Sequence, residues 1–258
     1  MRFTFLFLCL FWFPSQYLFS QKFKVQYIEK RLILVDEEKG LFANKYETSN
    51  IEYAFFLRSL NKKNLQIAQY DSSLWSSKFP WSYNVPITKN YHNHKAFYYY
   101  PVVNISQEGA EMFCQWLTKK YNAYKKRKFK KVIFRLPTEA EWLQIAKYSP
   151  NESPYATASG AFSDEFGTYE MNFKMMELDH LSYDMDGYIY TAPIHHFPAN
   201  NQGFFNLSGN AAEMTAIKDI SMGGHWDAFP EECELQSRTE FVYPDPRVGF
   251  RIVMELVE

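Results

Sequence analysis

The spacing of apolar and polar positions divides the chain into short strands and a few helices joined by long connections. Runs rich in Val, Ile, Leu and Phe predict strands at 31–35, 41–46, 101–105, 132–134 and 248–254. Apolar residues at helical spacing predict helices that begin after Thr48 or Ser49, after Ser106 and after Thr138. The first should end at 61–64, the second near 120 and the third near 148. We expect the last strand to close the sheet beside the first.

The most clearly defined helix start lies in the segment 135–142, Arg-Leu-Pro-Thr-Glu-Ala-Glu-Trp. Pro137 ends the preceding strand because proline has no N–H to pair, and it keeps Leu136 extended. Thr138 followed three residues later by Glu141 predicts a capping box. The double glycine at 223–224 indicates a place where another backbone or a ligand approaches closely.

The connection at 71–101 is long, irregular and rich in aromatic residues. A disordered linker would not carry so many large apolar side chains, so we expect an ordered loop packed on the domain. His92 and His94 lie in this loop. They could be metal ligands, but without a third partner nearby we interpret them as surface histidines.

Residues 1–20 have the composition of a secretory signal peptide, with Arg2 before an apolar run from Phe3 to Phe13. The alternative is a membrane anchor. Residues 21–258 then form a single domain outside the cytoplasm, periplasmic or secreted. The net charge of −1 favours neither nucleic acid nor an anionic membrane. The basic run at 125–131 is interpreted as a solvated hairpin between a helix and a strand rather than a polyanion site.

The leader contains one of the three cysteines, which leaves Cys114 and Cys233. A pair outside the cytoplasm can form a disulfide, and two buried or free thiols are the alternative. The sequence leaves both open, because a disulfide requires specific geometry.

Six blocks in one order resemble the formylglycine-generating enzyme, or sulfatase-modifying factor, family. They are 46–50, 101–106, 135–142, 200–213, 223–226 and 248–251. The resemblance implies a loop-rich α+β fold related to the C-type lectin fold, with short strands and a few helices. It also implies an oxidase that converts a sulfatase cysteine to formylglycine, using oxygen and copper held by two cysteines.

The positions matching those two cysteines are Ala228 and Cys233, so one thiolate is missing. Because Cu(I) requires a pair of soft ligands, we expect no copper and no such oxidation. If the chain were an enzyme, Cys233 would be its catalytic residue. His225 replaces a small polar residue of the family. Some relatives hold iron on histidines, and His195, His196 and His225 would be the candidates here.

The resemblance also implies structural calcium bound by side-chain and carbonyl oxygens from scattered loops. The first matching set is Asn172, Phe173, Asp186 and Tyr188, and a looser second set is Asn200, Asn201 and Gly203. The alternative interpretation is that these are ordinary turns.

Segments 83–91 and 99–103 are also similar to gliding-motility and type IX secretion lipoproteins of the same fold. This chain is shorter and lacks their lipid-attachment cysteine. Two hypotheses follow. The first is a non-catalytic binding or scaffold protein with an envelope or secreted protein partner; the second is a formylglycine-generating or related metal-dependent oxidase.

Overall fold

The computed structural model describes residues 23–82, 86–147, 153–177, 180–182, 184–241 and 244–257. The leader predicted at 1–20 lies outside these residues. None of the described helices is both long enough and apolar enough to cross a bilayer.

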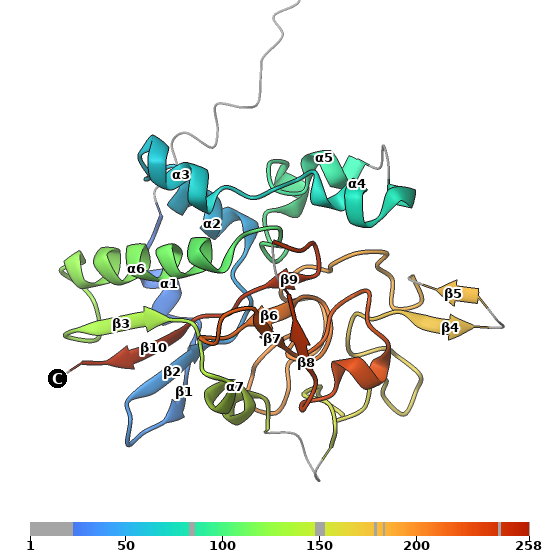
Figure 1. Ribbon diagram of the computed structural model, residues 1–258. Helices are drawn as coiled ribbons and strands as arrows, with labels where there is room; N and C mark the ends of the chain where they lie inside the picture. The colour runs from blue at the N-terminus through green and yellow to red at the C-terminus, as the bar shows by residue number, and fades with distance from the viewer. Residues whose placement is uncertain are drawn as a thin grey trace, which may run out of the picture.

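One antiparallel sheet contains β1 (Leu32–Asp36), β2 (Leu41–Asn44), β10 (Val253–Leu256) and β3 (Val132–Arg135), in that spatial order. A second sheet has the order β8 (Arg238–Glu240), β7 (Ile220–Met222), β6 (Ala212–Met214) and β9 (Val248–Gly249). In it, β6 pairs in parallel with β9. Separately, β4 (Met175–Glu177) and β5 (His180–Ser182) form a two-stranded antiparallel sheet, as Figure 1 shows.

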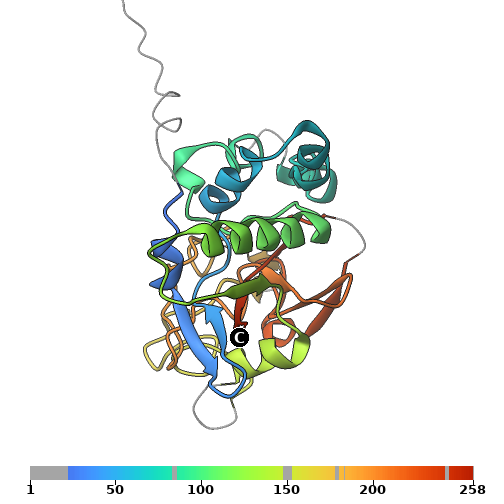
Figure 2. The same ribbon diagram turned by 90° about the vertical axis from the view of Figure 1, so that its left-hand side faces the viewer.

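The helices gather mainly on one side of the first sheet. The longest, α6 (Gln107–Ala123), packs on β3 and contacts both α2 (Asn50–Leu57) and α3 (Lys62–Ala68). Figure 2 shows α6 between the sheet and these outer helices. The remaining helices are α1 (Gln26–Glu29), α4 (Leu74–Lys78), α5 (Pro86–Asn90) and α7 (Glu139–Ala146), with 3₁₀ turns at Pro80–Ser82, Lys95–Phe97 and Pro230–Cys233. The expected α+β class, with short strands and few helices, is confirmed.

The predicted helix starts are confirmed by their caps. The Ser106 hydroxyl accepts from Gly109 N at 3.0 Å. Thr138 and Glu141 bond each other's backbone N–H groups at 3.2 and 2.9 Å, which is a capping box. The segment expected to end the first helix instead starts α3, because the Asn61 side chain accepts from Asn64 N and caps a new helix.

Two predicted strands are wrong in detail. The segment 101–105 forms only a single bridge, between Pro101 and Ser49, because Asn104 takes a positive φ of 60° that interrupts extended backbone. The final strand divides into β9 and β10, which belong to different sheets. Moreover, β10 pairs with β2 and β3 rather than lying beside β1.

The described parts of the aromatic connection, 71–82 and 86–101, pack on the domain, as expected. Trp75 and Tyr91 are fully buried in a cluster that also contains Trp226. The interpretation of His92 as a surface residue is wrong: it is buried, its Nε2 lies 2.9 Å from Val103 O, and its ring stacks on Tyr70. His94 is exposed, as expected. The basic run at 125–131 connects α6 to β3, and its lysines are exposed.

Candidate functional site

A fully buried polar cluster lies where the N-terminal and C-terminal parts of the chain meet. The Glu47 carboxylate accepts from Asn206 Nδ2 and Asn210 Nδ2, both at 2.8 Å. Asn210 Oδ1 in turn accepts from Ala192 N at 2.7 Å and from Asn172 Nδ2 at 3.2 Å. Burial, helped by the charge of Glu213, raises the pKa of Glu47 to about 8. The cluster connects four loops through side chains that have little access to water.

Asn172 leads from this cluster to the first predicted calcium set. Its Nδ2 donates to Tyr190 O at 2.7 Å, whereas its Oδ1 is buried and has no hydrogen-bond partner among the described residues. The Asn172 carbonyl packs closely against Gly209. Only glycine fits at 209, because a Cβ there would lie 2.2 Å from Asn172 O. A buried acceptor without a donor is costly, so a cation or a water is the natural partner for this oxygen.

Asp186 is held beside the same segment. Its Oδ2 accepts from Phe173 N at 2.8 Å and its Oδ1 from Tyr188 N at 2.9 Å. Burial raises the pKa of this carboxyl to about 7 despite these two bonds. The structure therefore brings together Asn172, Phe173, Asp186 and Tyr188. Their carboxylate and carbonyl oxygens, together with Asn172 Oδ1, which has no hydrogen-bond partner among the described residues, are the kind of ligands that a hard cation such as Ca²⁺ prefers.

The second predicted set does not fit a cation in the same way. Asn200 Oδ1 already accepts from Gln202 N at 3.1 Å and Phe204 N at 3.0 Å. Gly203 N donates to Asn200 O at 2.8 Å, and Asn201 is exposed. The atom of Asn200 that has no partner among the described residues is Nδ2, a donor. Both oxygens of Asn200 are thus used within the loop, as in a side-chain-stabilised turn.

Cys233 lies in a small buried cluster with Ala228 and Phe173. Its Sγ is 3.9 Å from His225 O, and burial raises the pKa of the thiol to about 12. The thiol is therefore protonated at neutral pH, whereas copper requires thiolate. Ala228 contributes no ligand, so this pair of positions does not fit Cu(I).

The second cysteine lies elsewhere in the core. Cys114 packs among the residues of α2, α6 and the first sheet, and both cysteines are free thiols. The disulfide left open by the sequence is therefore not formed. The two cysteines belong to different buried clusters, and Cys233 packs against Gly224, where a Cβ would lie 2.6 Å from its Sγ.

The histidines considered as iron ligands do not form a metal site. His195 and His196 are exposed in a turn, and His196 Nδ1 bonds Tyr188 OH at 3.0 Å. His225 is buried, and burial lowers its pKa to about 3. Across the described ranges, no three residues among His, Cys, Asp and Glu are grouped so as to hold a metal.

Reasoning from the sequence missed the Glu47 cluster as a unit. Glu47, Asn206 and Asn210 each lie inside a block that carried the family resemblance. The signal was thus present, but the sequence does not show that residues 159 and 163 positions away bond to one carboxylate.

Comparisons with known proteins agree with this architecture. The model of the family described as sulfatase-modifying factor enzyme 1-like domain matches residues 36–256. The formylglycine-generating enzyme of Streptomyces coelicolor is 29% identical over 117 residues, which are 44% of this chain and 31% of that enzyme. The match thus spans about a third of the length of the curated relatives.

Two solved structures share the fold. Treponema denticola variable protein 1 superposes with a TM-score of 0.54 at 14% identity, over 87% of this chain and 91% of that one. CarF superposes with a TM-score of 0.50 at 16% identity, over 84% and 87% of the respective chains. At such identities the likeness concerns the fold alone.

Proposed function

Since this chain belongs to the sulfatase-modifying factor enzyme 1-like domain family, we propose that it is a non-catalytic member that serves as an extracytoplasmic binding or scaffold domain. The observation that carries the proposal is the state of the position matching the reactive centre. Cys233 is a single, fully buried thiol, and Ala228, in the same cluster, occupies the position where the family resemblance implies a second thiolate.

The charge pattern around Cys233 supports the same conclusion. A thiol becomes a nucleophile or a soft metal ligand when neighbouring cations lower its pKa. Here the neighbouring charges that act on Cys233 are the carboxylates Glu232 and Glu231, which raise its pKa further. His225 is held neutral by burial, which lowers its pKa, and cannot supply a positive charge to offset them.

The experiment is incubation of the full chain with copper, oxygen and a Cys-x-Pro-x-Arg peptide, followed by mass spectrometry. We expect no conversion of the peptide cysteine to the aldehyde. The matched variant is Ala228→Cys, which supplies the second thiol. We expect it to bind Cu(I) stoichiometrically, whereas the unaltered chain does not. Aldehyde formation by the unaltered chain would contradict the proposal and favour the formylglycine-generating oxidase.

A structural calcium ion forms a second part of the proposed function. The residues that would hold it are Asn172, through Oδ1, and Asp186, with the carbonyl groups of Phe173 and Tyr188. The orphaned Asn172 oxygen and the desolvated Asp186 carboxyl support this assignment. The loops at 172–173 and 186–188 would then be cross-linked by the ion, which rigidifies the face on which they lie.

The location outside the cytoplasm rests on the sequence of residues 1–20, whose apolar run has the pattern of a signal peptide. We propose a protein of the cell envelope or the secreted fraction as the partner. A pull-down from envelope extracts, compared with one from the cytoplasmic fraction, tests both points. Recovery of only cytoplasmic partners would contradict them.

A further inference from the structure

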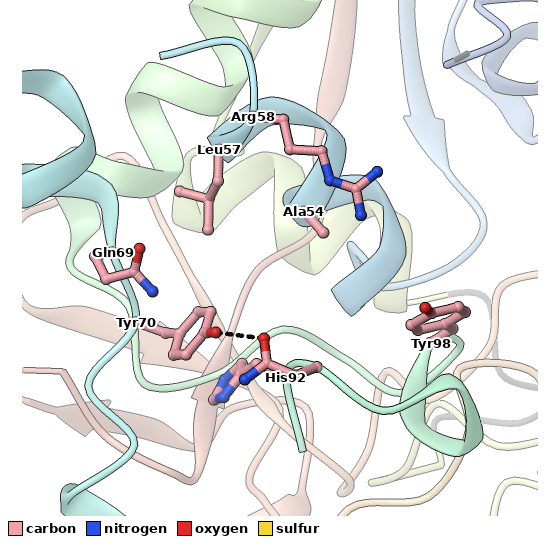
Figure 3. Close-up of a pocket in the computed structure, with 8 residues that line it drawn as sticks. Ala54, Leu57, Arg58, Gln69, Tyr70, His92 and Tyr98 are labelled. Carbon is pink, nitrogen blue, oxygen red and sulfur yellow. Dashed lines mark hydrogen bonds between the residues drawn. The ribbon is translucent and has the colours of Figure 1, made fainter. Parts of the chain in front are cut away.

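A pocket away from the calcium loops and from Cys233 opens between α2 and the aromatic connection. It encloses about 190 Å³. Figure 3 shows Leu57 and Arg58 reaching it from α2, with Tyr70 and His92 on the opposite wall and Tyr98 at one side. Tyr70 is fixed there, because its hydroxyl donates to Asn93 Oδ1 at 2.7 Å and its ring stacks on His92 at 3.9 Å.

A smaller chamber has four lining residues in common with this pocket, namely Ala54, Leu57, Tyr70 and His92. The chamber encloses about 10 Å³ and is also lined by Asn50, Tyr53 and Val102. A space of this size holds one water-sized group. We call the larger pocket the vestibule; the chamber beside it has room for a single polar atom.

Asn50 gives the chamber its chemistry. Its Nδ2 donates to Tyr91 O and Phe97 O, both at 3.0 Å, which fixes the orientation of the amide. Its Oδ1 is buried and has no hydrogen-bond partner among the described residues. Asn50 as a whole is 3% exposed. A buried, oriented and unsatisfied acceptor favours a hydrogen-bond donor in the chamber.

His92 adds a second acceptor to the shared wall. Burial lowers its pKa to about 4, so the ring is neutral at neutral pH. Its Nε2 lies 2.9 Å from Val103 O and must donate to that carbonyl. A neutral imidazole has one donor and one acceptor nitrogen, so Nδ1 is left as the acceptor.

Whereas the chamber offers hydrogen-bond acceptors, the vestibule offers a cation and flat or apolar surface. Among the described residues that line it, Arg58 is the one that carries a formal charge. Tyr70, Tyr98 and Leu57 offer flat or apolar surface. The vestibule thus suits an anionic group near Arg58 and a flat body against the rings.

We propose that this pocket binds a small flat carboxylic acid that carries a hydroxyl group at its far end. The carboxylate pairs with Arg58, the planar body lies along Tyr70, and the hydroxyl enters the chamber and donates to Asn50 Oδ1. An amine in place of the hydroxyl is disfavoured, because an ammonium group would lose its hydration in a chamber whose lining residues include no carboxylate. The acid is either a free small molecule or the C-terminal tyrosine of a protein chain, which has the same groups.

The probe is 4-hydroxyphenylacetate, and binding is measured by isothermal titration calorimetry on the full chain. Phenylacetate lacks the hydroxyl, and 2-(4-hydroxyphenyl)ethanol lacks the carboxylate. We expect each of these to bind about tenfold or more weakly than the probe, since each loses one buried or charge-assisted hydrogen bond. The phenylacetate comparison tests the role of Asn50 without a substitution that would disturb its two structural bonds.

Two variants test the location. Arg58→Gln should weaken binding about tenfold or more, and Ala54→Leu should abolish it by filling both cavities. The matched control is Lys62→Gln, which makes the same charge change at an exposed residue of α3 outside the pocket. Circular dichroism and melting curves confirm that each variant is folded.

A peptide ending in tyrosine, compared with its C-terminal amide, distinguishes the two sources of the acid. Binding of the free-acid peptide but not of the amide indicates a protein terminus. Binding of 4-hydroxyphenylacetate alone indicates a small molecule. The proposal is overturned if the probe does not bind, which leaves the chamber to a water, or if it binds equally to the Arg58→Gln and Ala54→Leu variants.

Discussion

Arg251 and Glu213 form a doubly hydrogen-bonded ion pair in the centre of the fold. Arg251 Nη2 lies 2.6 Å from Glu213 Oε1, and Nε lies 2.9 Å from Oε2. The two side chains are 0% and 1% exposed. Arg251 also donates to Asn44 O at 3.0 Å and to Phe205 O at 2.7 Å, so one guanidinium joins three segments of the chain.

Replacing this arginine should be among the most destabilising single substitutions. Arg251→Met leaves the Glu213 carboxylate buried without its cation, and we expect the free energy of unfolding to fall by about 3–5 kcal/mol. Chemical denaturation measures the change. The control is Arg238→Met, whose half-exposed pair with Glu139 should contribute about 0–1 kcal/mol. Equal losses in the two variants would contradict a special role for burial.

The Glu47 carboxyl predicts a pH dependence of stability. Burial raises its pKa from 4.5 to about 8 in the folded protein. In the unfolded chain the Glu47 carboxyl has its ordinary pKa of 4.5. The contribution of the protonated carboxyl to the stability of the fold is therefore complete below that pH. It is lost progressively as the pH rises to about 8, because ionisation then favours the unfolded chain.

The measurement compares the unfolding free energies of the unaltered protein and Glu47→Gln at about pH 5 and about pH 8. We expect the unaltered protein to lose more stability across this interval than the variant does, by an amount on the order of a few kcal/mol. Groups common to both proteins cancel in the difference. Parallel pH profiles would show that Glu47 is ionised throughout.

Calcium should raise the melting temperature. A ligand that binds only the folded state at about a hundred times its Kd adds about 2.7 kcal/mol of stability. For a domain of this size that corresponds to a rise of roughly 5–10 °C relative to protein in chelator. Differential scanning calorimetry measures the shift.

A pair of variants assigns the calcium effect to the loop. Asp186→Asn should abolish the calcium-dependent shift, because it removes the charge that the ion neutralises. Asp184→Asn makes the same change at an exposed neighbour and should preserve the shift. An identical melting temperature in calcium and chelator would argue against any structural ion.

Position 223 requires glycine for two reasons, its backbone conformation and the closeness of its neighbours. Its φ is 91°, and a Cβ there would lie 2.5 Å from Leu207 O and 2.9 Å from the Trp142 ring. We expect Gly223→Ala to destabilise the fold by several kcal/mol, on the order of combined backbone strain and core overpacking.

Gly167 separates these two causes. Its φ is also positive, at 79°, but a Cβ at this residue would have no neighbouring atom within 4 Å. Gly167→Ala should therefore cost only the backbone strain of roughly 1–2 kcal/mol. If both substitutions had the same effect on the unfolding midpoint, steric contact at Gly223 would not be important.

Local features of the fold could be predicted because they depend on neighbouring residues. The capping boxes at Thr138 and Ser49 arise from side chains three positions from the N–H groups they bind. The double glycine was expected to mark a close approach, and the structure confirms one, between Gly223 and Leu207. By contrast, the break between β9 and β10 and the burial of His92 depend on partners elsewhere in the fold.

The sequence by itself determined the family and the helix starts, and it predicted that one cysteine is missing at the positions matching the reactive centre, since each depends on residue identity or short-range spacing. Only the tertiary structure decided what surrounds the surviving groups. Glu47 meets Asn206 and Asn210, Asp186 accepts from Phe173 N, and Asn50 is left with an unsatisfied oxygen among the described residues. These relationships join segments far apart in the chain. Their physical basis is the desolvation of polar groups, which exists only once the core has formed.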